Sequence, residues 1–247
     1  MPIVPFARRV VSWISSKIPS YPVESTQREK EIMDECKPFT MTSSARLWAT
    51  ISSSKYVLNN NIRGAFVECG VWRGGSAMAM AKIATLLHCD RDIYLFDTFE
   101  GMTKPSSFDK DRSGESAGSL LDKTKKSDGN GVWCIASIND VKSNIAGTCY
   151  PSEKVHYIKG DVCATLEDAT NLPAEISLLR LDTDWYESTK KELEVLFPRL
   201  SKGGVCLIDD YGHWQGAKKA VDEYLNEQGI VPLLHVTDYT GRAFIKP

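Results

Sequence analysis

The sequence predicts a three-layer α/β fold whose mostly parallel sheet ends in an antiparallel hairpin. Short apolar segments alternate with longer helical ones along most of the chain, and the last two apolar segments are joined directly by a turn. Strands that alternate with helices pair in parallel and are covered on both faces. Glycine or acidic residues follow the expected strands, at the sheet edge where such folds bind ligands.

The individual elements follow from periodicity, capping residues and turn residues. Strands are expected at residues 64–69, 92–96, 155–158, 176–181 and 205–208. Helices are expected at residues 42–59, 76–87, 137–144, 187–200 and 215–227. Residues 230–236 and 242–245 flank a turn at 238–241, and this pattern predicts the terminal hairpin.

The chain is long enough for one large domain, which we expect at residues 41–247 after an N-terminal extension of residues 1–40. Residues 1–23 hold no Asp or Glu and mix basic with apolar side chains. They predict an amphipathic helix that contacts a second subunit or a membrane surface, with a docking helix, a loose tail or a transit peptide as alternatives. A homo-oligomer is expected on this basis. The polar stretch 103–131 is expected to be a lid or a disordered insertion.

Composition excludes several classes of protein. A net charge of -2 gives no bulk field that would favour nucleic acid. The 7 cysteines are scattered and form no Cys-x-x-Cys pair, which argues against a disulfide framework and a zinc site. No apolar run reaches the length of a membrane span. We therefore expect a cytoplasmic protein whose partner is a small molecule.

The loop after the first strand, residues 68–76 (ECGVWRGGS), is suited to an anionic ligand. Gly70 allows a tight turn, and Gly74 and Gly75 allow backbone N–H groups to approach a ligand at a helix N-terminus. The anion is a pyrophosphate in a nicotinamide enzyme and a methionine carboxylate in a methyltransferase. Close packing of helix on strand also requires glycine, so the loop alone leaves these alternatives open.

Two further acidic residues end expected strands. Asp97 lies where a carboxylate can accept hydrogen bonds from both ribose hydroxyls of a nucleoside cofactor. Asp161 ends the third strand and could face the adenine amine. Each of them could instead be an ordinary turn or cap residue.

Acid pairs follow the last two parallel strands: Asp182 with Asp184, and Asp209 with Asp210. Neighbouring strand ends lie about 5 Å apart, so the four carboxylates should crowd one edge of the crevice. Such crowding is tolerable when a cation lies among them, and oxygen ligands suit Mg²⁺. The alternative is that Asp184 and Glu187 cap a helix while the second pair forms a turn.

At these positions the sequence resembles the macrocin O-methyltransferase family, which also contains mycinamicin and novobiocin sugar methyltransferases. The likeness covers about residues 40–230, and Arg46 fits the helix that precedes the first strand. The segments that carry it are 68–76, 96–102 (FDTFEGM), 181–189 (LDTDWYEST), 203–204 (GG) and 209–211 (DDY).

The resemblance implies a Rossmann-like class I methyltransferase fold that uses S-adenosylmethionine and Mg²⁺ or another divalent cation to methylate a sugar hydroxyl. It implies that Asp182, Asp209 and Asp210 ligate the metal and that Asp184 is the general base. Together with the strand-end positions, it gives the expected cofactor residues: Glu68, Gly70, Trp72, Gly74, Gly75, Ser76, Asp97, Thr98 and Asp161.

Three competing hypotheses remain at this stage. A catechol-type O-methyltransferase would need an aromatic slot, for which Trp185, Tyr186 and Trp214 are candidates. A nicotinamide-dependent oxidoreductase and a non-catalytic binding protein of the same fold are the others. His213 is an alternative general base.

Overall fold

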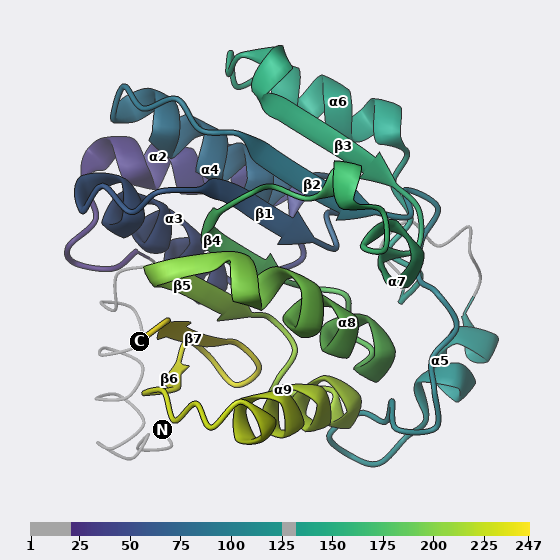
Figure 1. Ribbon diagram of the computed structural model, residues 1–247. Coiled ribbons are helices and arrows are strands. Elements are labelled where there is room, and N and C mark those ends of the chain that lie inside the picture. The colour runs from purple at the N-terminus through teal and green to yellow at the C-terminus, as the bar shows by residue number, and fades with distance from the viewer. Residues whose placement is uncertain (1–20, 125–131) are drawn as a thin grey trace, which may run out of the picture.

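The computed structural model describes residues 21–124 and 132–247, which form one seven-stranded sheet with helices on both faces (Figure 1). The strand order is β3, β2, β1, β4, β5, β7, β6. Strands β1 to β5 pair in parallel, whereas β7 is antiparallel to both β5 and β6, which confirms the predicted fold class. The strands are β1 (Ala65–Cys69), β2 (Ile93–Asp97), β3 (Val155–Lys159), β4 (Ile176–Leu181), β5 (Leu200–Ile208), β6 (His235–Val236) and β7 (Arg242–Ile245).

Two helical layers enclose the sheet. Helices α2, α3, α4 and α6 pack on one face, and α7, α8 and α9 pack on the other (Figure 1). The helices are α2 (Gln27–Cys36), α3 (Ser44–Asn59), α4 (Gly75–Leu86), α5 (Ala117–Lys123), α6 (Ile138–Ala146), α7 (Val162–Thr165), α8 (Tyr186–Leu196) and α9 (Gln215–Glu227).

Successive residues of the central strands pack against opposite helical layers. Phe66 of β1 and Leu178 of β4 lie in the core beneath α3 and α4. Their neighbours Val67 and Leu179 lie in the core beneath α8 and α9. Because both faces of the sheet are covered, the central strands are mostly apolar. The chain leaves their carboxyl ends at the edge where such folds bind ligands.

Three predicted boundaries are wrong. Strand β5 begins at Leu200 rather than at residue 205. Helix α8 ends at Leu196 rather than at residue 200, because Pro198 lies in a 3-10 turn (Phe197–Arg199) and Leu200 already belongs to β5. The strand expected at 230–236 is reduced to β6, because β7 pairs with only its last two residues.

Helix α2 lies within the expected N-terminal extension and was not predicted. Thr26 and Glu29 form a capping box at its start, and Ile32, Met33 and Cys36 are buried against the core beneath α4. The domain boundary at residue 40 stays a prediction. The amphipathic helix expected at residues 1–23 lies almost wholly outside the described residues.

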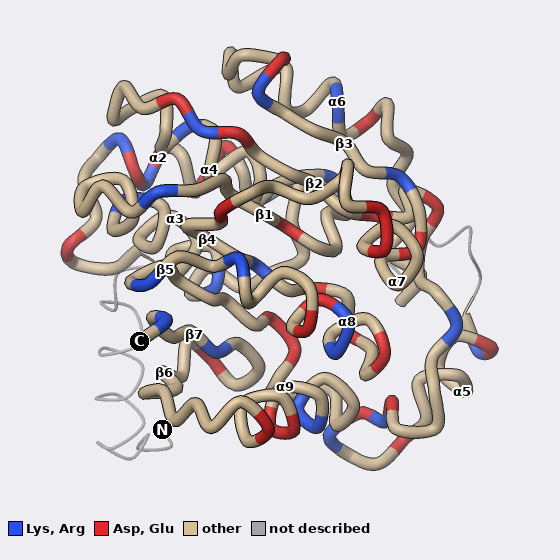
Figure 2. Tube along the Cα trace, in the orientation of Figure 1, with Lys and Arg blue, Asp and Glu red and all other residues tan. Residues whose placement is uncertain are grey.

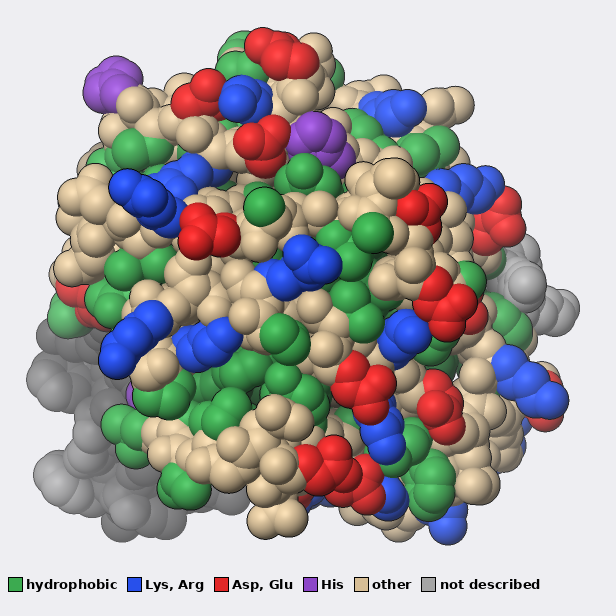
Figure 3. Space-filling view, viewed as in Figure 1, with side chains coloured by type: hydrophobic (Ala, Val, Ile, Leu, Met, Phe, Trp, Pro, Cys, Tyr) green, Lys and Arg blue, Asp and Glu red, His purple; other side chains and the backbone are tan. Residues whose placement is uncertain are grey.

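The expected insertion at 103–131 contains helix α5, which contributes Ala117 and Leu121 to a small apolar cluster with Trp185 and Trp214. Residues 125–131 lie outside the part that the structure describes. In that part, no helix is long and apolar enough to cross a membrane. Lys and Arg are interspersed with Asp and Glu along the chain (Figure 2), and both signs are mixed on the face seen in Figure 3.

Candidate functional site

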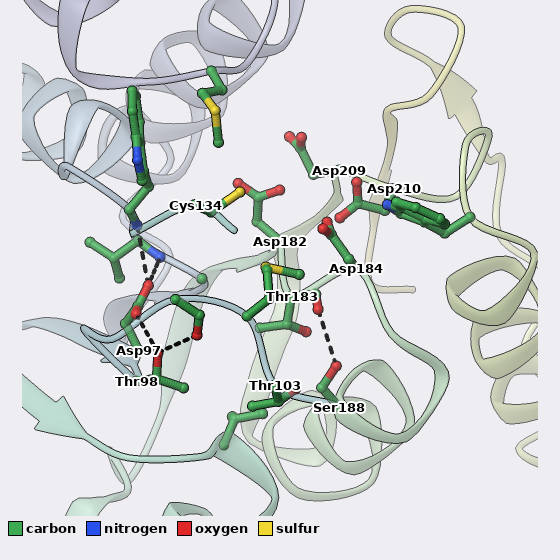
Figure 4. Close-up of a pocket in the computed structure, with 18 of the residues that line it drawn as sticks. Asp97, Thr98, Thr103, Cys134, Asp182, Thr183, Asp184, Ser188, Asp209 and Asp210 are labelled. Carbon is green, nitrogen blue, oxygen red and sulfur yellow. Dashed lines mark hydrogen bonds between the residues drawn. The ribbon is translucent and has the colours of Figure 1, made fainter. Parts of the chain in front are cut away.

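A pocket opens beyond the carboxyl ends of the parallel strands. One wall comes from the segments that follow β1, β2 and β3, and the opposite wall comes from the segments that follow β4 and β5 together with residues 40–42, Arg46 and the turn at 239–240. The acid residues Asp182, Asp184, Asp209 and Asp210 therefore share one pocket with Asp97 (Figure 4). This is the location that the order of elements predicts for a ligand site.

Asp97 shapes the loop after β1. Its Oδ2 accepts hydrogen bonds from the backbone N–H groups of Val71 (2.6 Å) and Trp72 (3.2 Å), and its Oδ1 accepts one from Phe99 (2.6 Å). Burial raises the pKa of Asp97, whereas these N–H groups act in the opposite direction. The carboxylate is thus held beside the loop by three backbone donors, and the two hydrogen bonds from the loop after β1 are drawn in Figure 4.

Gly70 is required where β1 meets β4. It has a φ of 81°, and a Cβ at this position would lie 1.9 Å from the carbonyl oxygen of Asp182. Gly70 therefore lies directly against the backbone of Asp182 in the acid cluster. Only a residue without a side chain fits there.

The predicted cofactor residues divide into two groups. Gly74 and Gly75 contact protein rather than the pocket: a Cβ at Gly74 would meet Val141, and one at Gly75 would meet the backbone of Phe39 and Cys36. Glu68 and Ser76 are also buried, so cofactor contacts of these four residues stay predictions. The predicted residues that line the pocket are Gly70, Trp72, Asp97, Thr98 and Asp161.

Asp161 also has the ordinary role that the sequence left open. Its Oδ1 accepts a hydrogen bond from the N–H of Cys163 at 2.9 Å and so caps α7. In contrast, Asp184 does not cap α8, because the N-cap is Trp185 and the first N–H of the helix, on Tyr186, donates to Asp109 Oδ1 at 2.7 Å. The capping interpretation therefore fits Asp161 and fails for Asp184.

Three carboxylates converge at the ends of β4 and β5. Oxygen atoms of Asp182, Asp184 and Asp210 all lie within 4.8 Å of one another. Burial, followed by the charge of Asp182, raises the pKa of Asp210 to about 7. Burial and the charge of Asp210 likewise raise the pKa of Asp184 well above its ordinary value. Such a cluster is stabilised in its ionised form by a cation.

Asp209 lies beside this group but faces two arginines. Its Oδ1 accepts a hydrogen bond from Arg180 at 2.6 Å, and its Oδ2 is paired with Arg46. Arg46 in turn donates through Nε to Asp238 at 3.0 Å. The structure thus brings three of the four predicted acids together, and the role of Asp209 as a metal ligand stays a prediction.

Arg180 is the main site residue that the sequence analysis missed. It lies within β4, is 2% exposed, and donates to Glu68 at 2.9 Å, to Asp182 at 2.7 Å and to Asp209 at 2.6 Å. Burial nevertheless raises the pKa of Glu68 to about 8, and its Oε2 has no hydrogen-bond partner within residues 21–124 and 132–247. An arginine inside an otherwise apolar strand (ISLLRL) was the signal, because a buried guanidinium needs acidic partners.

The aromatic candidates are mostly structural. Trp185 is 2% exposed, packs edge-on against Trp214 at 5.0 Å between ring centroids, and donates to the carbonyl of Thr103 at 3.1 Å. Tyr186 donates its hydroxyl to Glu223 at 2.7 Å, away from the pocket. Trp214 and His213 line the pocket, as does Cys134, which the sequence analysis did not single out.

Comparison with known proteins agrees with this geometry. A model of the macrocin O-methyltransferase (TylF) family matches residues 13–246. A tetracenomycin-C rhamnosyl 4'-O-methyltransferase of Streptomyces olivaceus is 33% identical over 187 residues, which cover 75% of this chain and 67% of that protein. A demethyldecarbamoylnovobiocin O-methyltransferase of Streptomyces niveus is 31% identical over 225 residues, which cover 88% of this chain and 81% of that protein.

Solved structures give the same result. The O-methyltransferase NovP aligns with a TM-score of 0.72 and 28% identity over 96% of this chain and 95% of its own. The S-adenosylhomocysteine-bound methyltransferase PaMTH1 of Podospora anserina aligns with a TM-score of 0.53 and 14% identity over 100% of this chain and 99% of its own, and supports the fold alone. The chain is a methyltransferase and belongs to the macrocin O-methyltransferase family.

Proposed function

We propose that the protein transfers a methyl group from S-adenosylmethionine to a hydroxyl of a sugar or glycosylated small molecule, with the help of Mg²⁺ or another divalent cation. The observation that carries the proposal is the convergence of Asp182, Asp184 and Asp210 in the same pocket as the loop after β1. The names of the two curated relatives, which describe methyl transfer to rhamnosyl and novobiocin-type compounds, support a sugar-containing acceptor.

The wall formed by β1, β2 and β3 fits the nucleoside cofactor. The buried indole N–H of Trp72 has no hydrogen-bond partner among the described residues, and the backbone N–H of the same residue donates to the carboxylate of Asp97 at the end of β2. An unpaired buried donor and a strand-end carboxylate are the kinds of group that a nucleoside with an amino-acid moiety would satisfy. S-adenosylmethionine supplies an electrophilic methyl group when bound there.

The wall formed by β4 and β5 fits a hard divalent cation. Carboxylate oxygens are the ligands that Mg²⁺ prefers, and Asp182 and Asp210 provide them from neighbouring strand ends. We assign these two residues as ligands. Asp209 is the third ligand predicted from the sequence. Each of its oxygens is paired with an arginine, so one oxygen would have to leave that arginine in order to bind the cation. The cation would lower the pKa of the acceptor hydroxyl.

Asp184 is assigned as the general base. It belongs to the acid group, lines the pocket and does not cap the following helix. Its raised pKa brings its proton affinity toward that of a weakly acidic hydroxyl, which favours proton transfer. Asp184 would hold the acceptor hydroxyl through a hydrogen bond and take its proton as the oxygen attacks.

The experiment combines binding with turnover. Calorimetry of the full chain should detect S-adenosylhomocysteine and Mg²⁺, and mass spectrometry of sugar acceptors incubated with S-adenosylmethionine should detect a gain of one methyl group that EDTA abolishes. A catechol is assayed in parallel as the aromatic alternative. Binding of neither the nucleoside nor the cation would refute the proposal, and methylation of the catechol alone would replace the acceptor class.

A further inference from the structure

Asp184 is the central residue of a tight turn that leads from β4 to α8. The N–H of Trp185 donates to the carbonyl of Thr183 at 2.8 Å, and Asp184 between them has a φ of 68°. Such a left-handed backbone is uncommon for a residue with a side chain, and it persists only where neighbouring contacts hold it. The position of the Asp184 carboxylate therefore depends on what holds the residues next to it.

Asp109 holds the start of α8 from a distant part of the chain. Its Oδ1 accepts a hydrogen bond at 2.7 Å from the N–H of Tyr186, which is 77 residues away in the sequence. Its Oδ2 accepts hydrogen bonds from the N–H and the hydroxyl of Ser106, at 2.6 and 2.7 Å. Asp109 is 0% exposed. Its carboxylate thus satisfies an N–H that the helix itself leaves free, at the helix end where negative charge is favourable.

Helix α9 makes room for this carboxylate and fixes its backbone. A Cβ at Gly216 would lie 1.9 Å from Oδ1 of Asp109, so a side chain there would displace the carboxylate. The N–H of Gln215 donates to the carbonyl of Lys110 at 2.9 Å, and the N–H of Ala117 donates to the carbonyl of Asp109 at 2.9 Å. Asp109 is therefore held between the starts of α8 and α9.

The same segment also contacts Trp185, the residue directly after Asp184. The indole N–H of Trp185 donates to the carbonyl of Thr103 at 3.1 Å, and its ring packs in the apolar cluster with Ala117 and Leu121 of α5. Asp109 is not among the described residues that line the pocket. It can therefore influence the chemistry only through the residues that it holds.

Resting on the assignment of Asp184 as the general base in the proposed function, we propose that Asp109 is a positioning residue for Asp184. Its hydrogen bond to Tyr186 fixes the start of α8, and the fixed helix start keeps the Asp184 carboxylate directed at the acceptor hydroxyl. Residues 103–121 are then part of the support of the base. Loss of Asp109 should slow the proton transfer without weakening the binding of the nucleoside or the cation.

The test compares variants of the full chain. Asp109→Ala removes the acceptor for the N–H of Tyr186, whereas Asp109→Asn keeps one oxygen for it. Gly216→Ala displaces the carboxylate without removing it. Thr26→Ala is the matched control, because Thr26 also caps a helix, α2, but lies outside the pocket.

Three measurements are made on each variant. Steady-state methyl transfer to methyl α-L-rhamnopyranoside gives kcat and KM. Calorimetry gives the affinities for S-adenosylhomocysteine and Mg²⁺. Hydrogen–deuterium exchange followed by mass spectrometry reports the protection of the backbone in residues 183–190 without turnover.

We expect Asp109→Ala and Gly216→Ala to lower kcat about 10- to 100-fold, because a displacement of about 1 Å costs about 10²-fold in rate. The KM and the two affinities should stay within about threefold, since the lost interaction acts in the transition state. Residues 183–190 should exchange faster in both variants. Asp109→Asn should restore slow exchange and bring kcat to within about threefold of wild type, and Thr26→Ala should change neither quantity.

Several results would overturn the inference while the proposed function stands. These are an unchanged kcat in Asp109→Ala, a parallel loss of kcat and both affinities, an equal loss in Asp109→Asn and Asp109→Ala, or unfolding of both Asp109→Ala and Gly216→Ala when Thr26→Ala folds. The last result would give Asp109 a purely structural role.

The exchange measurement separates this inference from the proposed function. If the wild type binds both ligands but does not methylate the rhamnoside, exchange alone decides: unchanged exchange in Asp109→Ala overturns the inference, and faster exchange that Asp109→Asn reverses supports it. If the wild type binds neither S-adenosylhomocysteine nor Mg²⁺, the proposed function fails and the role of Asp109 toward a base fails with it.

Discussion

The two walls of the pocket use aspartate in different ways. On the wall after β1 and β2, Asp97 is surrounded by backbone N–H groups that act as partial positive charges. On the wall after β4 and β5, Asp184 and Asp210 face each other and Asp182. A carboxylate held by three amides stays beside its loop and keeps a lone pair for a ligand, whereas carboxylates that raise one another's pKa are suited to bind a cation or to accept a proton. The same residue type thus positions a loop on one wall and gathers negative charge on the other.

The largest effect is expected from Asp184→Asn, which removes the proposed base. Asparagine tolerates the positive φ of 68° at this position, so the fold should be kept. Turnover should fall about 10²- to 10⁴-fold while the affinity for Mg²⁺ changes little. Rate assays and calorimetry measure the two quantities. Asp168→Asn, at an exposed cap remote from the pocket, is the control. A rate within a few-fold of wild type would assign the proton transfer to another group.

Among the variants that test stability, Arg180→Met should lower the free energy of unfolding most. It leaves Glu68 and Asp209 buried without their shared guanidinium, and breaking a buried ion pair costs about 3–5 kcal/mol. The free energy of unfolding in urea measures this loss. Arg28→Met is the matched control, because Arg28 also pairs with two carboxylates but is 47% exposed, and exposed pairs contribute about 0–1 kcal/mol. Equal losses in both variants would contradict the role of burial.

Gly70→Ala tests the contact between the two walls. A left-handed backbone costs an L-residue about 1–2 kcal/mol, and the clash with the carbonyl of Asp182 should add about 1–3 kcal/mol. Gly114→Ala separates the two contributions, since Gly114 has a φ of 93° but no heavy atom of the described residues lies within 4 Å of the position that a Cβ would occupy there. Thermal unfolding should therefore show the larger loss for Gly70→Ala. Equal losses would mean that the walls are not in close contact.

The smallest effect is expected from Thr240→Val, which deletes one hydroxyl on the pocket wall that follows β4 and β5. Its hydrogen bond to the carbonyl of Asp209 should contribute about 1 kcal/mol to the free energy of unfolding. Thr240→Ser retains the hydroxyl and should retain most of the stability. If Thr240→Val unfolds at the same urea concentration as wild type, the C-terminal turn is held by its other contacts.

The sequence was sufficient for features that depend on chain order. Strand ends follow from periodicity, and parallel pairing then places Asp182, Asp184 and Asp210 at one sheet edge. It was insufficient for features that depend on side-chain partners across the fold. Nothing local to Asp209 indicates that Arg46 and Arg180 flank it, and nothing local to Gly75 indicates that its lack of a side chain admits the backbone of Phe39.

The guanidinium of Arg180 joins three strands, since it bonds Glu68 on β1, Asp182 after β4 and Asp209 after β5. A ligand that shifts the end of β1 therefore also shifts Arg180, and with it the position and the electrostatic environment of the acids. Conversely, an ion bound among the acids changes the position of Arg180 and so of β1. Under the proposed function, thermodynamic linkage then requires that the cation and the nucleoside change each other's affinity by the same factor.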